Sequence, residues 1–123
     1  MMSGHRVRSD LAGVEISQIS DVDGGLLEDR DIWGFVHLLK GVNPTETRTL
    51  VEPSTPGQRL VLNCIEVGTS ITVSAPAGTD FDGAGGDEAL FNAVGDILVI
   101  ESFYSTATQL SWRAVYNNSV TVS

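Results

Sequence analysis

The acidic, glycine-rich loop from Asp80 to Asp87 is the segment whose residue types and spacing come nearest to a known chemical site, a calcium-binding loop. Asp80 and Asp82 stand where the first and third oxygen ligands of such a loop would be. The fifth position is Ala84 and the twelfth is Phe91, so two of the oxygen donors that hold Ca²⁺ are missing. The sequence therefore favours a flexible surface loop and leaves ion binding open as the alternative.

Few other side chains are suited to catalysis. The chain has two histidines, His5 and His37, and a single cysteine, Cys64, which lie far apart in the sequence. No nucleophile elbow, phosphate-binding loop or zinc-protease motif is present. A distant carboxylate pair of the glycosidase kind stays open, although sixteen acidic residues on a short chain are typical of solvated surface charge. We therefore expect no enzymatic activity, no catalytic residue, no metal ligand and no cofactor.

Aromatic side chains are the remaining candidates for binding. Trp33 and Phe35 fall in one apolar stretch, and Trp112 lies near the end of the chain. Tryptophan rings can stack on sugars, but they more often pack in a core or at a subunit interface, where they bury a large area. We expect the same of these tryptophans.

The net charge of −9 limits the classes of partner. A surface this acidic repels phosphate, so we expect neither nucleic acid nor an anionic membrane to bind. The basic start of the chain has no apolar stretch behind it, and no run approaches the roughly 18 apolar residues that span a bilayer. We expect synthesis and folding in a cytoplasm.

The elements that must position these residues fall into two regions. Residues 1–44 are polar and weakly patterned at first and then hold the apolar stretch 32–39, which fits either a strand or a short helix. This region is expected to be an extended N-terminal arm with one uncertain element. Residues 45–123 are expected to form the folded domain, since 123 residues allow one core and not two.

From Arg48 onward, short apolar or alternating runs are separated by turn residues, which is the usual pattern of an all-β sandwich or barrel. Strands are expected at 47–51, 59–65, 70–74, 97–100, 110–116 and 119–122, with 97–100 central because it is apolar on both faces. Asn117-Asn118 fits a two-residue type I′ turn, which predicts a terminal hairpin. No exact internal repeat is visible, so we expect a compact antiparallel sandwich or barrel-like domain and not an array.

The second half of the chain, residues 47–123, resembles small β modules of bacteriophage structural proteins, namely head decoration (cement) proteins and fibre segments. The resemblance rests on Thr49-Leu50-Val51, Gly57 to Leu62, Ile71 to Pro76, Val94 to Ile100 with its Gly-Asp before four aliphatic residues, and Leu110 to Val115 with its Trp-Arg pair. It implies an all-β homotrimer without catalysis that binds other virion proteins. The first forty-odd residues match no such pattern.

The function expected from this resemblance is that of a virion structural protein made in the host cytoplasm, which binds the outside of the capsid and stabilises it by bridging subunits. Its partners would be the major capsid protein and further copies of itself. Arg6 and Arg8, the only clustered basic residues, and the aromatic Trp33 and Phe35 are the expected partner-binding residues. The alternative is a tail or head fibre module that binds a host receptor or glycan.

Overall fold

A computed structural model describes residues 9–10, 14–15, 17–28 and 33–123 of the chain. Within these residues all the regular secondary structure is β-strand, which confirms the all-β expectation. The strands are β1 (Ser9–Asp10), β2 (Val14–Glu15), β3 (Ser17–Ser20), β4 (Gly25–Leu27), β5 (Trp33–Leu38), β6 (Thr45–Leu50), β7 (Arg59–Cys64), β8 (Ser70–Ser74), β9 (Glu88–Phe91), β10 (Ile97–Tyr104), β11 (Leu110–Asn118) and β12 (Thr121–Val122).

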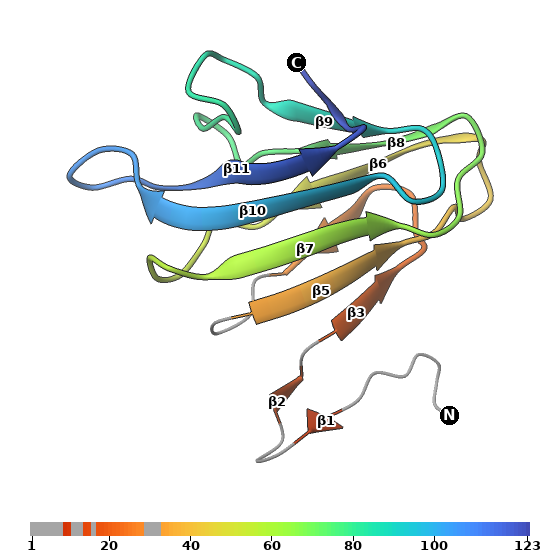
Figure 1. Ribbon diagram of the computed structural model, residues 1–123, viewed down its shortest axis with the longest axis horizontal. Helices are drawn as coiled ribbons and strands as arrows, with labels where there is room; N and C mark the ends of the chain where they lie inside the picture. The colour runs from red at the N-terminus through yellow and green to blue at the C-terminus, as the bar shows by residue number, and fades with distance from the viewer. Residues whose placement is uncertain (1–8, 11–13, 16, 29–32) are drawn as a thin grey trace.

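Two five-stranded sheets make up the body of the molecule (Figure 1). The first sheet has the order β11-β10-β7-β5-β3, and the second has the order β12-β9-β8-β6-β4. β1 and β2 form a separate two-stranded ribbon. The two large sheets enclose one hydrophobic core and do not join into a barrel, so the sandwich is confirmed and its barrel-like alternative is wrong.

The expectation of an antiparallel domain is wrong for half of the fold. β3, β5 and β7 pair in parallel in the first sheet, and β4, β6 and β8 pair in parallel in the second. The reason is that the chain alternates between the sheets from β3 to β8, so each strand returns to its own sheet only after crossing to the other one. Antiparallel pairing within the two large sheets is confined to the pairs that involve β9, β10, β11 or β12.

The parallel half consists of three stacked units, each made of a strand in the first sheet, a corner and a strand in the second sheet. The units are β3–β4, β5–β6 and β7–β8, and their strands stack in register. The expectation that the chain holds no array was therefore wrong at the level of structure. No repeat shows in the sequence because sheet stacking requires only that each strand alternate apolar and polar residues, not that the residues recur.

Strand alternation sets the core, as the sequence predicted for its clearest strands. Leu60, Leu62 and Cys64 of β7 are all fully buried, as are Ile71 and Val73 of β8. The apolar stretch 32–39 forms a strand, β5, rather than a short helix. The sandwich already begins at β3, inside the segment that the sequence assigned to the N-terminal arm.

The predicted terminal hairpin is wrong. β11 runs through Asn117 and Asn118 and pairs with β10, whereas β12 pairs with β9 in the other sheet. The Asn117 side chain makes the corner: its Nδ2 donates to the Val120 carbonyl at 2.7 Å and its Oδ1 accepts from the Val120 amide at 2.8 Å. Ser119 has a φ of 70°, the left-handed conformation that a sharp corner needs. These residues therefore carry the chain between sheets.

A buried ion pair ties the two sheets together where β3 and β5 end. Arg48 of β6 is fully buried, and its Nη2 lies 3.0 Å from Glu46 Oε1. The same guanidinium donates to Ser20 Oγ at 2.7 Å and to the Leu39 carbonyl at 2.8 Å. Ser20 is the last residue of β3, and Leu39 directly follows β5, so both acceptors belong to the first sheet's side. Such a charge is tolerated in a core only when its hydrogen bonds are satisfied.

Glu46 completes this network from the other side. Its two carboxylate oxygens each accept a backbone amide at 2.9 Å, one from Gly41 and one from Asn43. These two bonds, together with Arg48, lower the pKa of Glu46 below its ordinary value of 4.5, against the opposing effect of burial. The pair thus fixes the corner between β5 and β6.

Candidate interaction surface

The two outer faces of the sandwich differ in chemistry. On the second sheet, β6 and β8 place hydroxyl side chains side by side: Thr45 opposite Ser70, Thr47 opposite Thr72 and Thr49 opposite Ser74. The three β6 threonines are exposed, and the three β8 residues are half-buried. We call this set of six residues the hydroxyl face. Its side chains are readily hydrated, so these six residues are suited to solvent. The same side of the sheet also carries Leu26, which is 63 % exposed beside Thr49, and the half-buried Leu90 beside Thr72.

The first sheet exposes a larger set of apolar side chains, which lie on neighbouring strands. One row across it pairs Phe35, Val61, Val99 and Tyr116, and the next pairs Ile19, His37, Asn63 and Ile97. We call Ile19, Phe35, Val61, Ile97, Val99 and Tyr116 the apolar face. Ile19 and Tyr116, on the two edge strands, are 44 % and 57 % exposed, and Phe35 of β5 is 41 % exposed. Contiguous apolar surface of this kind is typical of an interaction site.

A bulge in β11 places Tyr116 on the apolar face. The sequence predicted that Leu110, Trp112, Ala114 and Tyr116 share one side of the strand. The register instead shifts between Val99 and Ile100, whose partners are Tyr116 and Ala114, so Val115 is the extra residue. Trp112 is fully buried, with its Nε1 donating to the Val51 carbonyl at 2.8 Å. The prediction is therefore wrong for Tyr116, which the bulge moves to the outer side.

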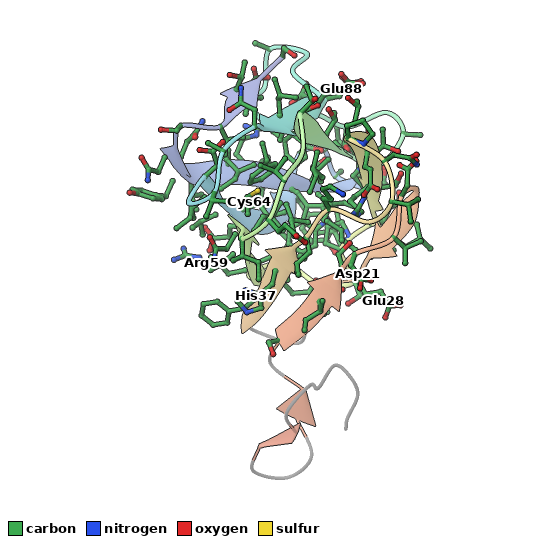
Figure 2. The ribbon with its side chains drawn as sticks, turned by 90° about the vertical axis from the view of Figure 1, so that its right-hand side faces the viewer. Asp21, Glu28, His37, Arg59, Cys64 and Glu88 are labelled. Atoms are coloured by element: carbon green, nitrogen blue, oxygen red, sulfur yellow. The ribbon has the colours of Figure 1, made fainter. Side chains whose placement is uncertain are left out.

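A charged row borders the apolar face. Arg59, Glu101 and Arg113 are cross-strand neighbours on its side of the first sheet, and Arg59 Nη2 lies 3.2 Å from Glu101 Oε1. The Arg113 guanidinium lies 4.5 Å from the ring centroid of Phe103 and 3.7 Å from Asp80 Oδ1. In Figure 2, Arg59 and His37 point from the same side of the molecule, away from Glu28. The five strands of the first sheet hold two arginines and one acidic residue, Glu101, so they carry less negative charge than the chain as a whole.

The structure brings one of the expected partner-binding residues to this surface. Phe35 is a central member of the apolar face. Trp33 pairs through its backbone with Arg59 at the start of β5, but its side chain lies outside the described residues. Arg6 and Arg8 also lie outside them. The sequence indicated Ile97 and Val99 only through the apolar residues on both faces of 97–100. It missed Ile19, Val61 and Tyr116, because the pairing of their strands was not predicted.

The loop from Asp80 to Asp87 is built around its own backbone. Asp80 accepts hydrogen bonds from the amides of Gly83 and Gly85, at 2.7 and 3.1 Å, and Asp82 accepts from two further amides in the loop, at 2.8 and 2.9 Å. These amides lower the pKa of Asp82. Across the described ranges, no three His, Cys, Asp or Glu side chains gather to hold a metal ion. The carboxylates therefore order the loop, which Phe81 anchors in the core.

His37 and Cys64 do not form a catalytic pair. They lie on neighbouring strands of the first sheet, but His37 faces outward and Cys64 faces the core (Figure 2). Burial raises the pKa of the Cys64 thiol, and the nearby Asp96 adds to this effect. A thiol in this state is a poor nucleophile. His5, the other histidine, lies outside the described residues.

Comparison with known proteins gives no family to which the chain can be assigned. No family model matches it, and no curated protein matches it either. Among the described residues, no helix is long and apolar enough to cross a membrane.

Proposed function

We propose that this chain is a virion structural protein that binds the outside of a bacteriophage capsid and stabilises it by bridging capsid subunits. It acts without catalysis and without a cofactor. Its partners are the major capsid protein and further copies of itself, with a homotrimer as the assembled form. The proposal combines the resemblance of residues 47–123 to phage structural modules with the chemistry of the two outer faces.

The contrast between the two outer faces is the observation that carries the proposal. An accessory protein on a particle needs one surface that stays against protein and another that stays in water. The apolar face is suited to the first, since burying apolar area stabilises a contact by about 25 cal/mol per Å² before association costs. The hydroxyl face is suited to the second. An enzyme would instead be expected to gather its titratable side chains, and here the buried Glu46 and Arg48 bind backbone groups and each other.

The two sheets also supply the rigidity that such a role requires. The buried Arg48 of β6 donates to groups at the ends of β3 and β5, so it ties the two sheets together at that corner. A rigid module loses little conformational entropy when it docks, which favours binding. In this proposal Arg6 and Arg8 form the basic contact with the capsid.

Fractionation of the encoding phage tests the proposal. Virions are purified, heads and tails are separated, and each fraction is analysed for the chain by mass spectrometry. The proposal predicts that the chain copurifies with heads. Copurification with tails would instead support the fibre module that binds a receptor or glycan, and absence from both fractions would refute a structural role in the virion.

A further inference from the structure

We propose that the apolar face of the first sheet is the surface through which copies of this chain associate with one another. This inference rests on the self-association in the proposed function and assigns it to particular residues, as a contact between two copies. The members nearest the centre of the sheet are Val61 of β7 and Val99 of β10, which are cross-strand partners. Around them lie the more exposed Phe35, Tyr116 and Ile19.

The charge of the chain favours a second copy on this face over a second copy on any other. With a net charge of −9, two copies repel each other wherever their acidic surfaces meet. The five strands of the first sheet contain two arginines, Arg59 and Arg113, and one acidic residue, Glu101. Contact through this sheet therefore leaves most of the acidic residues of both copies apart and in solvent.

The charged row is also complementary to itself. Arg59, Glu101 and Arg113 alternate in sign across neighbouring strands of the first sheet. When two copies meet face to face about a twofold axis, the same row is presented by both, and Glu101 of one can lie against an arginine of the other. A uniformly charged row would not allow this.

The size of the face limits the kind of contact it can make. Five strands at a spacing of about 4.8 Å, over about five residues of about 3.3 Å each, give a footprint of roughly 400 Å² per copy. Two copies then bury roughly 800 Å² in total, which is below about 1,200 Å² and therefore in the range of weak, transient interfaces. We therefore expect weak association that depends on concentration, and not an obligate assembly.

The hydroxyl face provides a matched control. Val61 and Thr72 occupy equivalent places: each is the half-buried, outward-facing residue of the middle strand of its sheet. The substitutions Val61→Lys and Thr72→Lys thus add the same side chain to opposite faces. Only the first places an unpaired ammonium at the centre of the proposed contact, where its desolvation opposes association. Tyr116→Lys, on the exposed edge strand, is a second variant that does not touch the core.

Analytical ultracentrifugation of the full chain and the variants over a range of concentrations tests this inference, with circular dichroism to confirm folding. The wild type is expected to sediment above its monomer mass of 13.1 kDa as concentration rises. Val61→Lys and Tyr116→Lys are expected to weaken association at least tenfold, while Thr72→Lys leaves it unchanged. A wild type that stays monomeric, or association that survives both face variants, would overturn the inference.

These outcomes are separate from those of the virion experiment. A chain that copurifies with heads but stays monomeric at all concentrations refutes self-association through the face and leaves the virion role intact. A chain that associates through the face but is absent from particles refutes the virion role alone. A face-to-face contact about a twofold axis predicts an assembled mass of two chains. A mass of three chains would overturn this contact and support the homotrimer of the proposed function instead.

Discussion

Replacing Arg48 with methionine is the sharpest test of how the sandwich is held together. The guanidinium is fully buried and donates to Ser20 Oγ, to the Leu39 carbonyl and to Glu46 Oε1, at 2.7, 2.8 and 3.0 Å. Methionine fills much of the same space but cannot donate. It leaves the acceptors of both sheets, and a buried carboxylate, without their partner.

The expected cost follows from this environment. Removing one member of a buried ion pair typically destabilises a protein by about 3–5 kcal/mol, because the remaining groups keep their desolvation penalty. A domain of this size unfolds with a free energy of about 5–15 kcal/mol, so Arg48→Met should remove a large part of it. At about 3–5 °C per kcal/mol, the Tm should fall by about 10–20 °C.

Arg59→Met is the matched control for this measurement. Arg59 also pairs with a glutamate, at 3.2 Å, but both side chains are more than a third exposed. Water screens such pairs, so the free energy of unfolding should change by about 0–1 kcal/mol. Urea unfolding at neutral pH, followed by circular dichroism, gives both values. A loss below about 1 kcal/mol for Arg48→Met would contradict the role assigned to the buried pair.

Three further outcomes are expected. Because the pKa of Glu46 is lowered in the fold, the ionised carboxylate stabilises the fold at pH values above its ordinary pKa of 4.5. The Tm should therefore be constant near neutrality and fall as the pH drops below 4.5, and a Tm unchanged down to about pH 3 would contradict this. Trp112→Phe removes the donor to the Val51 carbonyl and should cost about 1–3 kcal/mol in urea unfolding, whereas a neutral effect would mean that this bond is unimportant. Gly41→Ala brings a Cβ to 2.6 Å from the Asp21 carbonyl oxygen and should lower the Tm, while an unchanged Tm would show that the corner can shift.

Local alternation predicted the strands and their inward residues well. Leu60, Leu62 and Cys64 occupy alternate positions of β7, so they share one side of the strand. Only that side of β7 can face the core. Which strands become neighbours is not a local property, however. β5 and β7 are partners across a segment that visits the other sheet, and the residues of β5 do not reveal the direction of that pairing.

The apolar face could not be predicted as a whole for the same reason. Phe35 was predicted to bind a partner because it is aromatic, but the apolar face exists only once five strands lie side by side. Tyr116 joins it through a bulge at Val115, and nothing in the sequence around Val115 marks an extra residue. The Asn117-Asn118 pair correctly predicted a change of chain direction. An asparagine side chain that accepts and donates hydrogen bonds can form a corner between sheets as readily as a hairpin, however.

Cosedimentation with phage heads tests the central claim most directly. Purified full-length chain is incubated with heads that lack it and the mixture is separated on a sucrose gradient, with Thr72→Lys as a variant on the face expected to point to solvent. If the chain binds the capsid, wild type and Thr72→Lys both migrate with the heads in a saturable way, and the heads resist heating longer once the chain is bound. A chain that remains at the top of the gradient at every concentration would refute capsid binding.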